Sequence, residues 1–253
     1  MVAVQNFTRS PRINHFEVKI SGTWPEELSG HVFVVAPYHQ PGERHLFGGT
    51  GIIIRWNLAA HNGNVKLDWQ RVNTWDSFWQ DWFPLTWQQK AFFPARMSLL
   101  GVAEPVNTGV VNMDGRLILT ADAGRYWEID PVTLETITPV GYFDEHIISV
   151  PLSFFPMVAN TAHPFYEPKS GQLISCELKS LPRPGQLIYD MISQVYITIW
   201  DGKGALKHWE LEGTQLDGSP HTIIVTEEWA IIPDMPFQMG LTTLMGLKVP
   251  PAK

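Results

Sequence analysis

The stretch NTAHPFYEPKSGQLIS, residues 160–175, places a histidine directly before a proline, ahead of a turn built from Pro, Lys, Ser and Gly. The ring of Pro164 sterically restricts the residue before it, so His163 is expected to be extended. Two interpretations are open at this point. His163 is either a hydrogen-bonded residue of the turn or a ligand presented at the end of a strand.

Other kinds of chemical site find little support in the sequence. It shows no paired carboxylates, no Ser-His-Asp order and no glycine-rich phosphate loop. GGTG at residues 48–51 comes closest to such a loop, but it lacks the following lysine and a helix signal. DGKG at residues 201–204 is interpreted as a hairpin turn. The single cysteine, Cys176, excludes an intrachain disulfide and a thiolate metal cluster.

Short strands are the elements expected to position any functional residue. Twenty Gly and twenty Pro are spread along the 253 residues, which favours many short strands over long helices. Asp-Gly or Asn-Gly lies between β-prone runs in NMDGRLIL, TIWDGKGALKHWEL and LAAHNGNVKLDW, and this is the strongest short-range hairpin signal. We therefore predict an all-β fold, either a sandwich, a barrel or a propeller.

Composition and charge restrict the partners. The net charge of −7 and the pI of 5.7 leave no basic stripe for nucleic acid. The amino terminus MVAVQNFTRSPR lacks the apolar core of a secretory signal, and no run approaches the length of a spanning helix. We expect a cytoplasmic protein, with any membrane contact peripheral.

The segment 75–104 differs from the rest because it is rich in Trp and Phe and has few strand signals. It is either a helical or irregular segment that closes the core, or an exposed apolar patch where a lipophilic molecule or a bilayer docks. The residues predicted for such a membrane or substrate-entry patch are Trp75, Phe78, Trp79, Trp82 and Phe83.

Five motifs, in order along residues 20 to 237, resemble those of the carotenoid cleavage oxygenases. They are GTWPEELSGHVFVVAP, HLFGGTGIIIRWNL, NTGVVNMDGRLILTADAGRYWEIDPVTLET, TAHPFYEPKSGQL and HTIIVTEEWAIIPDMPF. This family of non-haem iron enzymes also includes the retinal pigment epithelium isomerase and lignostilbene dioxygenases. The resemblance implies a seven-bladed β-propeller with Fe(II) on its axis, held by four histidines.

The resemblance also implies which residues of this chain bind the metal. His163 of the AHP motif and His221 of the HTIIVTE motif match the first two ligands. Imidazole is a good ligand for ferrous iron, and four neutral ligands keep little charge near an apolar substrate. No catalytic residue beyond the metal ligands is implied.

A carboxylate partner usually orients a ligating imidazole, and the family supplies glutamates for this purpose. The matching position holds Asp122, which is shorter by one methylene. Contact with His221 is therefore expected to need a backbone shift or a bridging water. VVAP and FGGTG also depart from the family pattern and leave the substrate class open.

The other histidines are expected to be surface or structural residues. His45 lies in a family motif, but at a position that is not a ligand, so packing under a hairpin is expected. The remaining six fall outside the ligand motifs: His15, His31, His39, His61, His146 and His208.

Seven blades of about 40–45 residues need about 300 residues, so 253 residues are expected to hold only the first half to two thirds of the ring. The function implied is a dioxygenase that cleaves a conjugated double bond of a carotenoid or apocarotenoid with O2. This chain is then a truncated form, inactive alone, whose two imidazoles hold iron weakly. The alternatives are a degenerate, non-catalytic member that binds a lipophilic ligand, and an unrelated β-propeller interaction module.

Overall fold

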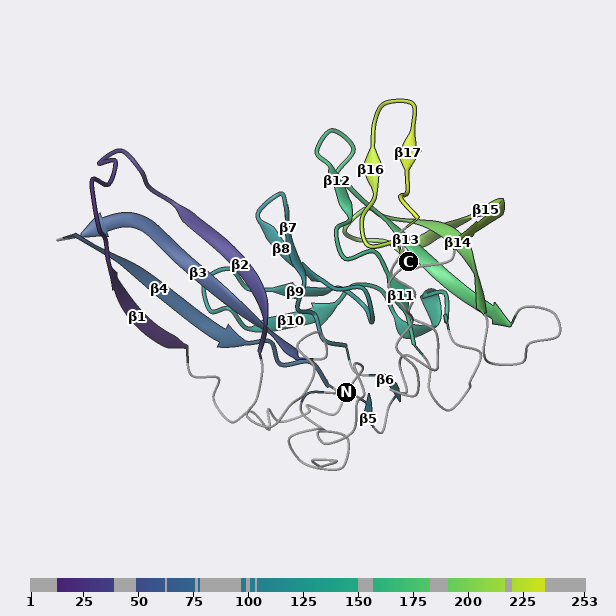
Figure 1. Ribbon diagram of the computed structural model, residues 1–253, viewed down its shortest axis with the longest axis horizontal. Coiled ribbons are helices and arrows are strands. Elements are labelled where there is room, and N and C mark those ends of the chain that lie inside the picture. The colour runs from purple at the N-terminus through teal and green to yellow at the C-terminus, as the bar shows by residue number, and fades with distance from the viewer. Residues whose placement is uncertain are drawn as a thin grey trace, which may run out of the picture.

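The computed structural model describes residues 13–38, 49–61, 63–75, 77, 97–98, 101–102, 104–149, 157–182, 191–216 and 220–234. Most of them lie in three antiparallel sheets of four or five strands. Figure 1 shows the sheets following one another in chain order across the molecule. The predicted all-β class is therefore confirmed, and η2 (Phe143–Glu145) is a single turn of 3-10 helix.

The first sheet has the order β1-β4-β3-β2. Its strands are β1 (Asn14–Lys19), β2 (His31–Tyr38), β3 (Thr50–His61) and β4 (Asn64–Arg71). The β3–β4 hairpin closes with His61 opposite Asn64, where the sequence predicts a hairpin. The start of β3 is buried, at Thr50, Gly51 and Ile53, whereas its last residues, 59–61, are exposed. In β4 the buried residues are Val65 and Gln70.

The second sheet has the order β10-β9-β8-β7. It contains β7 (Gly109–Met113), β8 (Arg116–Thr120), β9 (Trp127–Ile129) and β10 (Thr136–Pro139). The predicted Asp-Gly turn joins β7 to β8, with φ of 50° at Asp114 and 86° at Gly115. Positive φ at both central residues is the type I′ geometry, which matches the twist of the strands.

The third sheet has the order β11-β13-β14-β15, with β12 also paired to β13. These strands are β11 (Ala159–Asn160), β12 (Phe165–Glu167), β13 (Gln172–Pro182), β14 (Met191–Trp200) and β15 (Lys207–Leu216). After Trp200, the carboxylate of Asp201 accepts hydrogen bonds from the backbone N–H groups of Lys203 and Gly204. This is the predicted hairpin turn.

Two small sheets complete the described strands. The pair β16 (Ile224–Val225) and β17 (Ala230–Ile231) follows the third sheet and projects as the yellow hairpin of Figure 1. The pair β5 (Met97–Ser98) and β6 (Gly101–Val102) lies within the aromatic-rich segment 75–104.

The core lies mainly between successive sheets. One cluster joins Ile53 of β3 with Leu119 of β8, and so packs the first sheet on the second. Another joins Ile118 of β8 with Leu173 of β13, and so packs the second sheet on the third. A third cluster, which includes Val195, extends from β13 and β14 to Ile223. Strands β8 and β13 are thus held between neighbours. Asp122 follows β8 by two residues, and His163 lies between β11 and β12, which both pair with β13.

Candidate metal centre

His163 and His221 lie on two segments that run side by side. The N–H of His163 donates to the carbonyl of His221 at 3.0 Å, and the N–H of Ile223 donates to the carbonyl of His163 at 3.4 Å. His163 and Thr222 form an isolated parallel bridge. The two imidazole rings face each other edge to face, with centroids 4.8 Å apart and planes at 84°. The fold therefore brings together the two histidines that the motifs predict as ligands.

Asp122, two residues after β8, contacts one of these rings directly. Its Oδ1 lies 2.7 Å from Nδ1 of His221, and its main-chain carbonyl accepts from the N–H of Asn160 at 2.9 Å. At 2.7 Å no bridging water is needed, so the shorter side chain reaches the ring because β8 and β11 place it there. Burial raises the pKa of Asp122, and the hydrogen bond with His221 acts in the opposite direction.

The contact with Asp122 determines which nitrogen of His221 is free for a metal. An ionised carboxylate can only accept, so Nδ1 of a neutral His221 carries the proton and Nε2 carries the lone pair. A carboxylate on the second ring nitrogen is the common arrangement of a metal-binding histidine. Asp122 is therefore suited to orient His221 as a ligand.

Among the described residues, no carboxylate contacts the ring of His163. None of the described residues forms a side-chain hydrogen bond with its ring. Partial burial lowers the pKa of His163, and the nearby His221 lowers it further. A neutral imidazole is the form that binds a metal, so the ring of His163 is available at neutral pH.

The donor set of the site fits part of an iron centre. Two imidazoles on adjacent segments suit ferrous iron. Within the described ranges, however, no group of three or more His, Cys, Asp or Glu is arranged to hold a metal ion. The described residues thus offer two nitrogen ligands and one orienting carboxylate.

The structure describes only part of the predicted aromatic patch and of the remaining histidines. Trp75 is exposed, with 59% of its surface accessible. His45 and His39 lie outside the described residues, as do Phe78, Trp79, Trp82 and Phe83 of the predicted patch. His31 and His61 are exposed on the first sheet.

Three further histidines have partners that the sequence did not reveal. His15 pairs with Asp68 at 2.6 Å on the first sheet. His146 and His208 both contact the buried carboxylate of Glu177, at 2.7 and 3.2 Å. Each lies 31 residues from Glu177, so no short-range motif could have indicated the cluster.

The model of the family described as retinal pigment epithelial membrane protein matches residues 5–250. The chain belongs to this family, that of the carotenoid oxygenases. A carotenoid oxygenase relative, the isoeugenol monooxygenase of Pseudomonas nitroreducens, is 23% identical over 235 residues, which are 90% of this chain and 45% of that protein. The resveratrol cleavage oxygenase 1 of Chaetomium globosum is 23% identical over 231 residues, 89% of this chain and 36% of that protein. The chain thus spans less than half the length of these two relatives.

Solved structures of carotenoid oxygenases share the fold. The lignostilbene dioxygenase of Pseudomonas brassicacearum superposes with a TM-score of 0.62 at 21% identity, over 94% of this chain and 47% of that one. A variant of the Synechocystis apocarotenoid oxygenase superposes with a TM-score of 0.57 at 18% identity, over 94% of this chain and 50% of that one. The three sheets therefore form part of the β-propeller of this carotenoid oxygenase family, as the sequence motifs predict. The same membership removes the alternative of an unrelated propeller module.

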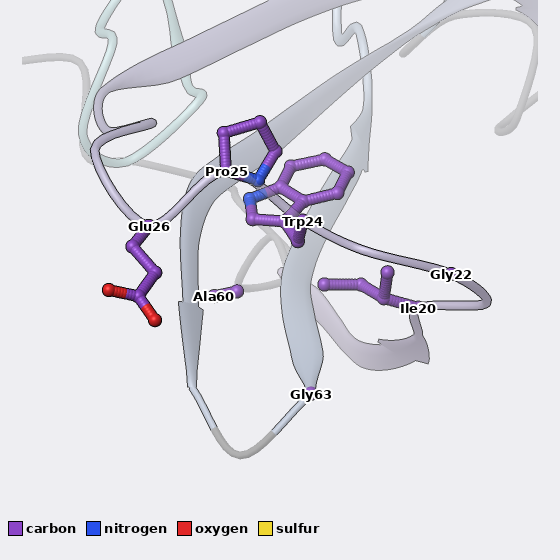
Figure 2. A pocket seen from close by; sticks show the side chains of 7 residues that line it. All are labelled: Ile20, Gly22, Trp24, Pro25, Glu26, Ala60 and Gly63. Atoms are coloured by element: carbon purple, nitrogen blue, oxygen red, sulfur yellow. The ribbon is translucent and has the colours of Figure 1, made fainter.

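A pocket of about 330 Å³ lies elsewhere, on the first sheet. Figure 2 shows the residues that line it: Ile20, Gly22, Trp24, Pro25, Glu26, Ala60 and Gly63. The indole N–H of Trp24 donates to the carbonyl of Leu58 at 2.9 Å and is not free for a ligand. None of the lining residues belongs to the histidine pair, so the pocket is separate from the candidate metal centre.

Among the described residues, no helix has the length and apolarity to cross a bilayer.

Proposed function

We propose that this chain contributes two iron ligands, His163 and His221, to a non-haem Fe(II) dioxygenase that cleaves a conjugated carbon–carbon double bond with O2. The observation that carries the proposal is the facing pair of imidazoles, whose ring centroids lie 4.8 Å apart. The carboxylate of Asp122 contacts Nδ1 of His221 and leaves Nε2 for the metal. Membership of the carotenoid oxygenases supports it.

The chain's own residues have distinct tasks in this proposal. His221 presents Nε2 because Asp122 holds the proton on Nδ1. His163 presents a neutral ring because partial burial lowers its pKa. Iron bound by these and further ligands would supply the activation of O2. Neither histidine needs to transfer a proton to the substrate.

Two substrate classes are proposed, in this order. The resemblance of the sequence motifs to those of the carotenoid cleavage oxygenases implies a carotenoid or apocarotenoid. The curated relatives are instead named for isoeugenol and resveratrol, which favours a phenylpropenoid or stilbene as the second candidate. Both classes are apolar and contain a conjugated double bond.

The first experiment measures metal binding. Anaerobic titration with Fe²⁺, followed by equilibrium dialysis, is expected to show weak and exchangeable binding to this chain. His163→Ala and His221→Ala should each weaken it at least about tenfold, because divalent affinity depends on each imidazole. His61→Ala, an exposed histidine on the first sheet, is the control and should leave it unchanged. Equal affinity in all variants would contradict the ligand assignment.

The second experiment measures turnover. Because iron is expected to bind weakly, the protein is incubated in air with excess Fe²⁺ and with an apocarotenal, isoeugenol or resveratrol, and carbonyl products are identified by mass spectrometry. Aldehyde from only one class selects that substrate class. A polyene absorbance shift without products is expected both of a truncated form that is inactive alone and of the non-catalytic alternative, a family member that only binds a lipophilic ligand.

Peripheral membrane contact and a cytoplasmic location stay predictions. Among the residues of the predicted patch, Trp75 is described and exposed, and exposed tryptophan is favoured at membrane interfaces. If the patch binds lipid, Trp75→Ser should lower co-sedimentation with liposomes and leave far-ultraviolet circular dichroism unchanged. Unchanged co-sedimentation would count against this use of Trp75.

A further inference from the structure

The two histidines of the candidate metal centre are held in different ways. Asp122 orients the ring of His221, whereas among the described residues no carboxylate contacts the ring of His163. A metal ligand needs a defined ring orientation. The segment before His163 is held by contacts with β8 and β13. The inference drawn from these contacts rests on the proposed function.

Thr120, the last residue of β8, forms a hydrogen bond with Ala162, the residue before His163. Its side chain is fully buried, and its Oγ1 donates to the carbonyl of Ala162 at 2.5 Å. Its own carbonyl accepts from the N–H of Thr108 at 3.0 Å, so Thr120 is itself fixed within the second sheet. The peptide that joins Ala162 to His163 is therefore attached to β8.

Gly109 lies opposite Thr120 in the β7–β8 register. A Cβ at this position would lie 2.6 Å from Oγ1 of Thr120, 3.1 Å from the carbonyl oxygen of Ala162 and 3.4 Å from Nδ1 of His163. The first distance is shorter than real Cβ contacts allow. Gly109 is not among the residues with positive φ, so glycine is needed here for space and not for backbone conformation.

The opposite side of the same segment is attached to the third sheet. Oγ1 of Thr161 donates to the carbonyl of Cys176 at 3.2 Å and accepts from its N–H at 3.0 Å. The residues before His163 are thus held between β8 and β13. Gly109 lies beside both the Thr120 hydroxyl and the ring of His163.

We propose that Thr120 and Gly109 are positioning residues for His163. The hydroxyl of Thr120 fixes the peptide before the histidine, and the missing side chain at Gly109 lets that peptide and the imidazole pack against β7 and β8. Together they replace the carboxylate that orients His221.

The test compares Co²⁺ affinity, as a spectroscopic substitute for Fe²⁺, across matched variants. Thr120→Val removes the hydroxyl at nearly constant volume, and Gly109→Ala adds the Cβ; each should weaken Co²⁺ binding about tenfold and alter the visible Co²⁺ spectrum. Thr120→Ser keeps the donor and should stay within about twofold of the unmodified chain. In the double variant, the fold-loss of Co²⁺ affinity should be smaller than the product of the two single fold-losses, because both changes act on one contact.

Thr136→Val is the matched control. Thr136, on β10, also donates from its hydroxyl to a main-chain carbonyl, that of Asn73, at 2.9 Å, but it is not part of the histidine site. Its replacement should leave Co²⁺ affinity and spectrum unchanged. Affinity in Thr120→Val equal to that of the control would overturn the proposal.

A metal-free measurement separates this proposal from the proposed function. In the isotope-labelled apoprotein, a nuclear Overhauser effect is expected between the Hα protons of Gly109 and the ring of His163, and it should weaken in Thr120→Val. Failure of the unmodified chain to bind Co²⁺ or Fe²⁺ would reject the proposed function, and the apoprotein spectra would still decide the positioning role. An unchanged effect in Thr120→Val would reject that role.

Discussion

The guanidinium of Arg55 donates from Nη1 to the main-chain carbonyl of Pro131 at 2.8 Å, across 76 positions of sequence. The same group also donates to the carbonyl of Val132 at 2.6 Å. Its other side is held by Asp68, with Nη2 2.5 Å and Nε 3.2 Å from Oδ2. Arg55 thus joins β3 of the first sheet to the loop after β9 of the second.

An arginine contact of the same kind joins the second sheet to the third. Arg116 of β8 is held by Glu128 at 2.8 and 2.6 Å, and it donates to the carbonyl of Gly202 at 2.6 Å. Its guanidinium also lies 5.0 Å from the ring centroid of Trp200. In both cases an arginine paired with a carboxylate of its own sheet donates to the backbone of the next sheet.

The first prediction concerns this attachment. Arg55→Lys keeps the charge but loses the planar fork that serves Asp68 and the two carbonyls. We expect a loss of about 1–3 kcal/mol in the free energy of unfolding, measured from the urea midpoint. Lys66→Met, at an exposed position of β4, should change it by less than about 0.5 kcal/mol. Equal effects in the two variants would show that the arginine contact is not stabilising.

The second prediction concerns pH. Burial alone would raise the pKa of Glu177, but the hydrogen bonds from His146 and His208 outweigh it, so the pKa is lowered. A carboxylate with a lowered folded pKa stabilises the protein above the unfolded pKa, about 4.3, and this contribution is lost as the pH falls further. The melting temperature should therefore fall more steeply below about pH 4.3 in the unmodified chain than in Glu177→Gln.

At pH 7 we expect Glu177→Gln to be less stable than the unmodified chain. Glu177→Gln removes a buried carboxylate that accepts from the N–H of Ile147 and contacts His146 and His208, and should cost about 1–3 kcal/mol. Glu212→Gln, at an exposed position of β15, serves as the control at both pH values and should follow the unmodified chain. Parallel melting curves for Glu177→Gln and the unmodified chain below pH 4.3 would contradict the assignment.

The third prediction concerns the only thiol. Burial raises the pKa of Cys176 to about 12, and the thiolate is the reactive form. The folded chain should therefore be almost unreactive toward a disulfide reagent at pH 8, whereas the chain in urea should react at the rate of a free thiol. Rapid reaction of the folded chain would show that β13 opens at this residue.

The fourth prediction concerns Asp122. Asp122→Ala removes the acceptor that holds the proton on Nδ1 of His221, and such a loss costs about 10–100-fold in metal affinity. Titration with Fe²⁺ under nitrogen measures it. Asp144→Ala, at an exposed position in η2, is expected to bind as the unmodified chain does. An affinity unaffected by Asp122→Ala would mean that the contact does not orient the ring.

Local signals in the sequence were sufficient for the all-β class and for the predicted hairpin turns. Asp114-Gly115 predicts a tight hairpin because positive φ is accessible to these residues, and the structure places φ of 50° and 86° there. The DGKG turn and the closure at His61 and Asn64 follow the same logic. Ordered motifs also identified His163 and His221 as a candidate pair, through resemblance and not through spacing.

The sequence by itself thus determined the all-β class, the family and the candidate ligands, because these depend on neighbouring residues. Only the tertiary structure decided which distant groups meet. It places the Asp122 carboxylate directly on His221, His146 and His208 on Glu177, and Gly109 beside His163. Such contacts depend on how separate sheets pack, and packing leaves no periodic signal along the chain.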